Sequence, residues 1–428
     1  MEFERRRSGS LALIILTGLN VLNYADRYVG AAVLPLLLSD LSLSDAEGGI
    51  LQSAFIVVYT FASPVAGWWG DRRARLPIAA VGVLVWSAAV VTSGFAPTYV
   101  LLLVARAVTG AGEAAYAVVT PSVLSDLFPP ERRGRALATF YAAMPVGAAL
   151  GYALGGALGA HWGWRLAFVV VGAPGIPLAW CLVRLGEPAR GAFDEARGDI
   201  STPLTLRASL RALGSRPSYV VNTVAQVLYT FAVGGLATWM PTYFLRERHV
   251  PLAPAAASFG AILMLAGLGG TLLGGQLGDW ATARRRAGHF IVSGWSLVAS
   301  LAFTVLGVIA PMPVVYWPAM FVALFLLFVN VGPLNAAMAN VLPADLRTRG
   351  FAVTTMLIHL FGDAASPWLI GLASDRVGLA APILASGALL AVSGVILLAG
   401  KAALERDLWA AGTPGPALPP EAPRRPAE

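Results

Sequence analysis

The chain has 428 residues, of which 57% are hydrophobic and only 12% are charged, and its formal net charge is +7. Soluble proteins carry about 25% charged residues, so this chain has too few charges to cover a water-soluble fold of its size. The composition therefore excludes two or three soluble domains. The apolar runs are about 20 residues long, which is the length of a helix that crosses a bilayer, so the chain is predicted to be an integral membrane protein.

Twelve apolar segments separated by charged stretches predict twelve membrane-spanning helices. The first six cover residues 11–38, 48–69, 76–95, 99–124, 136–159 and 165–185. The second six cover residues 218–245, 254–277, 289–310, 314–341, 350–372 and 379–400. The predicted parts are a cytoplasmic N-terminus at 1–10, six-helix bundles at 11–185 and 218–400, a cytoplasmic linker at 186–217, and a mostly disordered cytoplasmic tail at 401–428.

The basic residues predict the orientation of these helices. With a cytoplasmic N-terminus, 24 of the 30 basic residues lie in cytoplasmic segments, and two, Arg27 and Arg106, lie inside helices. Basic residues are enriched in cytoplasmic loops, so both termini are predicted to be cytoplasmic and we expect no nucleic-acid partner. The first apolar run is too long for a cleaved signal peptide. Arginine outnumbers lysine 29 to one, a bias typical of GC-rich bacterial genomes, so we expect a bacterial inner membrane.

Two patterns of the first half recur in the second half. Gly67-x-x-Gly70-Asp71 recurs as Gly275-x-x-Gly278-Asp279, and residues 128–138 recur as 342–352. The two offsets, 208 and 214 residues, are nearly equal. They indicate a duplicated six-helix unit, which in transporters places the substrate path between the halves.

These motifs resemble known transporter signatures. The run from Gly67 to Arg75, Gly-Trp-Trp-Gly-Asp-Arg-Arg-Ala-Arg, resembles a loop signature of the major facilitator superfamily, and the resemblance covers essentially the whole chain. Three further segments resemble the spinster family of lipid transporters: Asn23-Tyr-Ala-Asp-Arg27, Arg106-x-x-x-Gly-x-Gly-Glu-Ala114 and His359-Leu-Phe-Gly-Asp-Ala-Ala-Ser-Pro367. The resemblance implies an all-α fold of two pseudo-symmetric bundles, alternating access, a monomer, and proton-coupled transport of lysophospholipids or sphingoid phosphates.

Charged residues inside the predicted helices are the candidate coupling groups. A charge at the bilayer centre costs about 2.5–3.5 kcal/mol on insertion scales, so such residues are functional candidates by default. Arg106 and Glu113 are seven residues apart, roughly 10 Å along a helix, and Asp26 and Arg27 are adjacent, so neither arginine pairs well with the acid of its own helix. We therefore predict that an acid of one helix reaches the arginine of the other. The alternative is an ion-pair lattice that only holds helices together.

The spinster resemblance implies that Asp26 and Glu113 belong to the coupling groups, with Asp26 as the first candidate proton carrier. Burial disfavours a charged carboxylate and a nearby arginine favours it, so a changing arginine distance would load and release a proton. Arg27 and Arg106 would tune the acids or bind an anionic headgroup. His359 and Asp363, one turn apart, are a second titrating pair, or alternatively only a hydrogen-bonded packing pair.

Polar and aromatic positions predict an amphipathic cavity for a substrate with a polar head and an apolar tail. The predicted helices at 218–245 and 314–341 carry amide side chains and a tyrosine that face a cavity or, alternatively, only bond neighbouring helices. The candidate substrate-binding residues are Asn23, Tyr24, Tyr28, Tyr116, Tyr141, Asn222, Gln226, Tyr229, Asn330 and Asn335.

The loop signature predicts a gate. The resemblance implies that Asp71 interacts across the two halves in the outward-open state, with Arg72 and Arg75 adding bridges; alternatively these arginines only enforce topology. The candidate gating residues are Gly67, Asp71, Arg72, Arg75, Arg135 and Asp279. A ladder at Gly147, Gly151, Gly155 and Gly159 predicts close helix packing.

Other functions find less support. The single cysteine, the four scattered histidines and the absence of a P-loop predict no disulfide, metal, cofactor or direct ATP coupling. We expect a transporter rather than an enzyme, with an amphiphile or lipid, protons and membrane lipids as partners. The alternatives are a multidrug or small organic-anion transporter of the same fold, a membrane-embedded acyltransferase, and a receptor.

Overall fold

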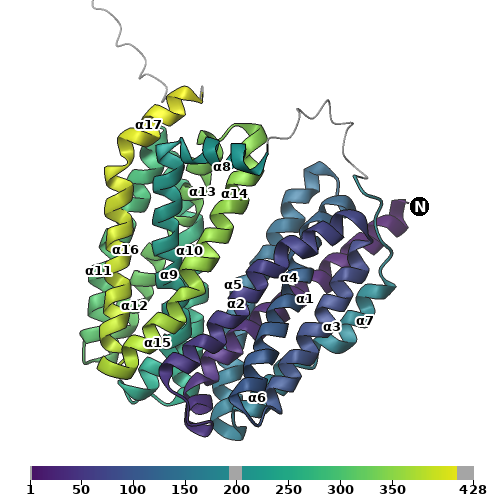
Figure 1. Cartoon of the computed structure of the whole chain (residues 1–428), viewed down its shortest axis with the longest axis vertical. Coiled ribbons are helices and arrows are strands. Elements are labelled where there is room, and N and C mark those ends of the chain that lie inside the picture. The colour runs from purple at the N-terminus through teal and green to yellow at the C-terminus, as the bar shows by residue number, and fades with distance from the viewer. Residues whose placement is uncertain (1, 192–204, 412–428) are drawn as a thin grey trace, which may run out of the picture. The chain divides into compact units, whose positions relative to one another are not determined.

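A computed structural model describes residues 2–191 and 205–411, which form helices and turns without a β-strand (Figure 1). The first half contains α1 (Glu2–Asp40), α2 (Asp45–Arg72), α3 (Arg75–Gly94), α4 (Tyr99–Leu127), α5 (Pro130–Trp162), α6 (Trp164–Gly172) and α7 (Gly175–Arg184). The second half contains α8 (Leu206–Gly214), α9 (Pro217–Arg246), α10 (Leu252–Thr282), α11 (Gly288–Ile309), α12 (Pro313–Phe328), α13 (Val331–Val341), α14 (Ala344–Ile358), η1 (His359–Asp363), α15 (Ala365–Val377), α16 (Ala380–Ala399) and α17 (Lys401–Ala410).

The prediction of an all-α membrane protein is confirmed. Within the described ranges, 12 helical spans are long and apolar enough to cross a membrane. Three spans are interrupted: α6 and α7 form one, α12 and α13 form another, and α14, η1 and α15 form the third. η1 is a π-helical turn, a wide turn that is frequent at functional sites.

The described residues form two compact units by their contacts. Unit 1 comprises residues 2–191, 230–265 and 356–386. Unit 2 comprises residues 205–229, 266–355 and 387–411. Unit 1 thus contains α1 to α7 together with parts of α9, α10, α14 and α16 and with η1 and α15, and each unit is treated by itself below.

Glycines of α5 allow a close approach to α1 within unit 1. A Cβ added to Gly151 would lie 2.5 Å from the carbonyl oxygen of Ala25, and one added to Gly155 would lie 2.7 Å from the Cβ of Ala32. These distances are shorter than real Cβ contacts, so only glycine fits. The predicted close helix packing is therefore confirmed, and it fixes the helix that carries Asp26.

We expect Gly151→Val to destabilise unit 1, because the added side chain meets backbone that cannot move aside. Overpacking a well-packed interior costs typically about 1–3 kcal/mol, so thermal unfolding in detergent should begin several degrees lower. Gly134→Ala, in the same helix, is the matched control, because nothing lies within 4 Å of its added Cβ. Equal unfolding temperatures for the two variants would contradict the tight contact.

Two predicted polar segments contain helices. The tail at 401–428, predicted to be mostly disordered, begins with α17, whose Leu404 and Leu408 are buried in unit 2. Asp407 of α17 accepts hydrogen bonds from the backbone N and the Oγ of Ser218, at 2.9 and 2.5 Å. The predicted linker contains α8, whose Leu213 packs with Tyr219 and Met338. Apolar side chains at helical spacing explain both differences; residues 192–204 and 412–428 lie outside the described ranges.

Candidate functional site

The four charged residues of helices 1 and 4 lie in unit 1. Glu113 is completely buried, and its Oε2 accepts a hydrogen bond from Arg27 Nη2 at 2.9 Å. This pair joins α1 to α4, which confirms the predicted pairing between the helices. The Arg27 side chain is 21% exposed while that of Glu113 is 0% exposed. The arginine is therefore the member of the pair that an arriving ligand can reach.

Asp26 and Arg106 bond to uncharged side chains of neighbouring helices. Asp26 Oδ2 accepts from Trp86 Nε1 of α3 at 3.0 Å, and Arg106 Nη2 donates to Gln52 Oε1 of α2 at 3.0 Å. Among the described residues, Asp26 Oδ1 and the Nε and Nη1 atoms of Arg106 have no hydrogen-bond partner. Asp26 and Arg106 are nevertheless 1% and 2% exposed. Buried polar groups are rarely left unpaired, so this cluster has unused bonding capacity.

Three aromatic rings surround the guanidinium of Arg27. Its Cζ lies 4.8 Å from the ring centroid of Tyr24, 4.9 Å from that of Phe55 and 5.2 Å from that of Tyr59. Phe55 and Tyr59 belong to α2 and were not predicted as site residues. Cation–π contacts of this kind hold a guanidinium in place without removing its hydrogen-bond donors. Arg27 is thus positioned by aromatic faces and by Glu113.

A pocket of unit 1 opens beside Arg27. Its volume is about 100 Å³, which is room for several water molecules. α1 and α2 contribute one part of its wall, and α9, His359 and Asp363 contribute the other. The polar lining residues are Arg27, Tyr28, Gln52, Tyr59, Thr230, Thr238, His359 and Asp363. Of the predicted site residues, the structure brings Arg27, Tyr28, His359 and Asp363 together here.

The π-helical turn η1 presents His359 and Asp363 to this pocket. His359 Nδ1 lies 3.0 Å from Asp363 Oδ2, so the two predicted partners are in contact. The ring of Tyr59 meets the His359 ring edge-on at 6.1 Å between centroids. A Cβ added to Gly234 of α9 would lie 2.7 Å from the Cα of Asp363, so this glycine lets α9 approach the turn. The turn is fixed by its surroundings in unit 1.

Several predicted substrate-binding residues of unit 1 lie away from the pocket. Tyr116 is fully buried, its hydroxyl donates to the carbonyl of Leu16 at 2.5 Å, and its ring packs against Trp86. It joins α4 to α1 in the interior of the bundle. Asn23 is buried and Tyr141 is exposed, and neither lines the pocket. The spacing of these residues along the helices did not show which of them face the interior.

The predicted amides of the second half lie in unit 2 and bond mainly to the backbone. Asn222 Nδ2 donates to the carbonyl of Leu334 at 2.9 Å, and Gln226 Nε2 donates to Asn222 Oδ1 at 3.2 Å. Asn330 donates to the carbonyl of Leu327, and Asn335 to that of Val331 at 2.8 Å. Tyr229 is half-buried on α9. Asn222 therefore joins α9 to α13, as the structural alternative for these amides predicts.

A second polar network of unit 1, which the sequence analysis missed, surrounds the first residue of α2. Asp45 Oδ1 lies 2.6 Å from Arg246 Nη1, and Asp45 Oδ2 accepts from Ser374 Oγ at 2.7 Å. The backbone N–H groups of Asp45 and Ala46 donate to the carboxylate of Asp375 at 2.8 and 3.0 Å. Asp375 thus caps α2 from α15, where a carboxylate is favoured by the helix dipole. The Ser44–Glu47 capping box was the available sequence signal for this helix start.

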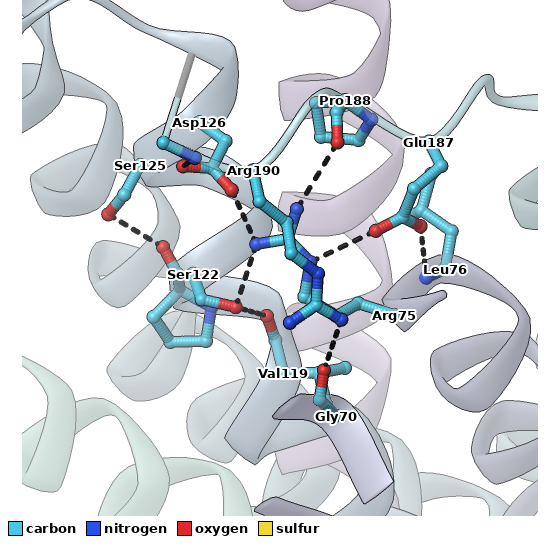
Figure 2. Close-up of polar contacts among 12 residues, drawn as sticks. Gly70, Arg75, Leu76, Val119, Ser122, Ser125, Asp126, Glu187, Pro188 and Arg190 are labelled. Atoms are coloured by element: carbon cyan, nitrogen blue, oxygen red, sulfur yellow. Dashed lines mark hydrogen bonds and ion pairs between the residues drawn. The ribbon is translucent and has the colours of Figure 1, made fainter. Parts of the chain in front are cut away.

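The predicted gating loop is held inside unit 1. Figure 2 shows Arg75 between Asp126 and Glu187, at 2.5 and 3.0 Å. Arg190 donates to the carbonyls of Gly70, Asp71 and Arg73, which end α2. Arg75 was predicted to bridge the two halves, but here it is 5% exposed and joins α3 to α4 and to the segment after α7. Its long side chain folds inward because two carboxylates lie there.

The other predicted gating residues are more exposed. Arg72 lies over the ring of Trp68, 4.3 Å from its centroid, and donates to the carbonyl of Trp68. The remaining predicted gating residues are exposed or half-buried: Gly67, Asp71, Arg135 and Asp279. Their role in gating remains a prediction.

Glu187 lies outside the predicted spans, and its hydrogen bonds determine the direction in which its pKa is shifted. Partial burial would raise the pKa of its carboxyl group, but hydrogen bonds from the Leu76 N–H and from Arg75 lower that pKa overall. A lowered pKa means that the ionised form stabilises the fold. This contribution is complete above the unfolded-state value of about 4.3 and is lost as the pH falls through the lowered value.

Comparisons with known proteins place the chain in a family. The profile of the Major Facilitator Superfamily matches residues 16–367. The sphingosine-1-phosphate transporter SPNS2 of Danio rerio is 32% identical over 394 residues, covering 87% of this chain and 77% of that protein. Protein spinster homolog 1 of Homo sapiens is 33% identical over 390 residues, covering 86% and 73%.

Solved structures agree on the fold. A crystal structure of a bacterial homolog of the human lysosomal transporter spinster, in an inward-facing and unoccupied conformation, superposes with a TM-score of 0.85. It is 23% identical in sequence, and the match covers 94% of this chain and 98% of that chain. The chain therefore belongs to the spinster family of the major facilitator superfamily and is a membrane transporter rather than an enzyme.

Proposed function

We propose that this transporter couples protons to the movement of a lipid-like amphiphile, a lysophospholipid or a sphingoid phosphate, across a bacterial inner membrane by alternating access. The named activity of the relative SPNS2, transport of sphingosine 1-phosphate, supports a phosphate-bearing amphiphile. The observation that carries the proposal is the pair of Arg27 and Glu113, in which a buried acid shares its cation with a pocket.

The pair gives a physical route for coupling. An anionic headgroup that enters the pocket competes with Glu113 for the guanidinium of Arg27. A buried carboxylate that loses its cation is costly and is neutralised by binding a proton. Asp26, whose Oδ1 is without a partner among the described residues, can also hold a proton in this cluster and remains the first candidate carrier.

The pocket suits one end of an amphiphile. Its cationic group is Arg27, and its aromatic and apolar groups include Phe55, Ile56 and Val233. Sites for drug-sized ligands have volumes of about 300–1,000 Å³, whereas this pocket has about 100 Å³. It therefore accommodates a headgroup, and binding of a whole lipid requires the pocket to enlarge. This is the expected behaviour of a transporter that alternates between states.

The orientation set by the basic residues puts both termini in the cytoplasm and the network around Asp45 at the periplasmic end. In this orientation, the bonds among Asp45, Arg246 and Asp375 hold the periplasmic ends of α2, α9 and α15 together. The network would then keep the pocket closed to the periplasm until transport requires it to open.

We expect Asp375→Asn to weaken this closure. An amide oxygen replaces only one of the two carboxylate oxygens that receive the N–H groups of α2, and the favourable charge at the helix start is lost. Loss of a helix cap costs about 1 kcal/mol, roughly a fivefold shift in an equilibrium. The measurement is labelling of Ala31→Cys, a pocket residue, by an impermeant maleimide from the periplasmic side in a Cys181→Ser background.

Asp40→Asn is the matched control for this experiment. Asp40 lies close to Asp45 in the sequence and pairs with Arg165, but both side chains of that pair are more than 40% exposed. Exposed pairs contribute little, so labelling should stay at the wild-type rate. A labelling rate in Asp375→Asn that also stays at the wild-type value would show that the network does not hold the pocket closed.

The test of the proposed function uses proteoliposomes with a trapped pH-sensitive dye. The vesicles are challenged with lysolipids, sphingoid phosphates, cationic drugs and small organic anions. Proton movement that is triggered by the lipids is the expected result. Movement with only drugs or small anions would retain the coupling but replace the substrate class. Substrate uptake with no proton movement would overturn the coupling.

A further inference from the structure

Unit 2 carries a basic cluster where the loop after α10 meets α17. Arg284, Arg285 and Arg286 follow one another in the five residues between α10 and α11. Lys401 and Arg406 of α17 are exposed. The Arg27–Glu113 pair, the pocket of unit 1 and the network around Asp45 do not involve these five cations.

A surface hollow lies inside this cluster. Its lining consists of Arg286 from the loop and Ala402, Glu405, Arg406 and Trp409 from α17. Trp409 is 70% exposed, and the guanidinium carbon of Arg286 lies 4.6 Å from its ring centroid. The stacked ring holds Arg286 at the edge of the hollow while its N–H donors stay free to face outward.

A second stacked pair flanks the loop. Arg284 lies 4.0 Å from the ring centroid of Trp280 and donates to the Trp280 carbonyl at 3.1 Å. Trp280 is 58% exposed and stands at the end of a membrane-spanning helix. Tryptophan is enriched at the level of lipid headgroups. Trp280 thus has the position that is typical of an interfacial tryptophan, and it holds Arg284 beside it.

The orientation of α17 exposes its basic residues beside the hollow. Its apolar residues Ala403, Leu404 and Leu408 are buried, so its exposed face carries Lys401 and Arg406. The carboxylate of Asp407 is engaged by Ser218. Glu405 is the one acid among the residues that line the hollow.

We propose that this hollow binds the headgroup of an anionic phospholipid with free hydroxyl groups, of the phosphatidylglycerol kind. Guanidinium groups match phosphate oxygens in a planar, two-bond geometry. Clustered basic side chains beside a membrane attract anionic lipids. Glu405 accepts hydrogen bonds from the headgroup hydroxyls, which a phosphatidylcholine headgroup lacks.

The experiment measures binding at this place on the full-length transporter. A Cys181→Ser, Ala402→Cys variant in detergent carries an environment-sensitive dye at the edge of the hollow and is titrated with short-chain phosphatidylglycerol, phosphatidylcholine and inorganic phosphate. We expect phosphatidylglycerol to bind about tenfold more tightly than phosphatidylcholine, in line with the attraction of basic clusters to anionic lipids. Arg286→Gln with Arg406→Gln should remove most of this preference, and Trp409→Ala should weaken it without changing the charge.

The matched control is Arg184→Gln. Arg184 also stacks on an exposed tryptophan at a helix end, 4.1 Å from the ring centroid of Trp180, but outside this cluster. The Arg184→Gln variant should keep the wild-type preference for phosphatidylglycerol over phosphatidylcholine. Equal binding of the two lipids would overturn the proposal, and so would an equal loss in Arg184→Gln. Inorganic phosphate that binds as tightly as phosphatidylglycerol would show that the ligand is not a lipid.

Discussion

Asp26→Asn is expected to abolish proton-driven accumulation of substrate while leaving a folded protein. The asparagine has the same shape, and its amide oxygen still accepts the hydrogen bond from Trp86 Nε1. The other oxygen, Oδ1, has no partner among the described residues, so the substitution removes no further bond. What is lost is the group that can bind and release a proton. Uphill flux into proteoliposomes under an imposed pH gradient should fall at least about a hundredfold, the lower end of the range for loss of a positioned acid–base group.

A control variant and a second assay show whether Asp26→Asn affects coupling alone. Asp40→Asn makes the same change in the same helix, but at an exposed acid, and should leave the flux unchanged. Downhill exchange of labelled substrate should persist in Asp26→Asn, because the wall of the pocket is intact. Unchanged uphill flux in Asp26→Asn would remove Asp26 from the coupling mechanism and leave Glu113 as the candidate.

Arg75→Gln is expected to destabilise unit 1 strongly. Removing one partner of a buried ion pair costs about 3–5 kcal/mol, because the other charge stays buried. Here Asp126, with a side chain that is 9% exposed, would lose its cation. Glu187 is 27% exposed and water can compensate it in part, so the loss should lie at the low end of that range.

The measurement is the unfolding midpoint in detergent, together with transport. If Arg75 serves stability, Arg75→Met combined with Asp126→Leu should recover most of the lost stability, because apolar packing often replaces a buried pair. If Arg75 instead bridges the halves during transport, as the family resemblance implies, the double variant will fold well and transport poorly. Arg72→Gln, on the exposed side of the same loop, should change the free energy of unfolding by less than about 0.5 kcal/mol.

The sequence predicted the parts of this molecule that depend on helix geometry. Twelve spans follow from the length of apolar runs. A pairing between an acid of one helix and an arginine of the other follows because Arg106 and Glu113, seven residues apart, are too distant for a bond within one helix; the spacing did not decide which acid pairs. The contact of His359 with Asp363 follows from a four-residue separation. These arguments need only distances along a helix, which sequence spacing determines.

Partners that depend on packing between distant segments could not be predicted in this way. Trp86 is one of 12 tryptophans, and nothing in its neighbourhood marks it as the donor to Asp26. Gln52 has no charge to draw attention, yet it is the partner of Arg106. Asp375 caps a helix that begins 330 residues earlier. Tyr116 shares its residue type with the predicted cavity tyrosines, but its hydroxyl bonds inside the bundle.

The π-helical turn at His359–Asp363 determines the direction in which the residues after it point. A π turn holds one residue more than an α turn, and one residue corresponds to about 100° of rotation in an α-helix. Everything after the turn, including Ser374 and Asp375, therefore points in a direction offset by that angle. Deleting one residue within the turn would rewind it to α geometry and rotate both Ser374, which donates to Asp45, and Asp375, which accepts from the first N–H groups of α2, away from the start of α2. The turn whose first and last residues line the pocket thus sets the angular register of a contact more than two helical turns away.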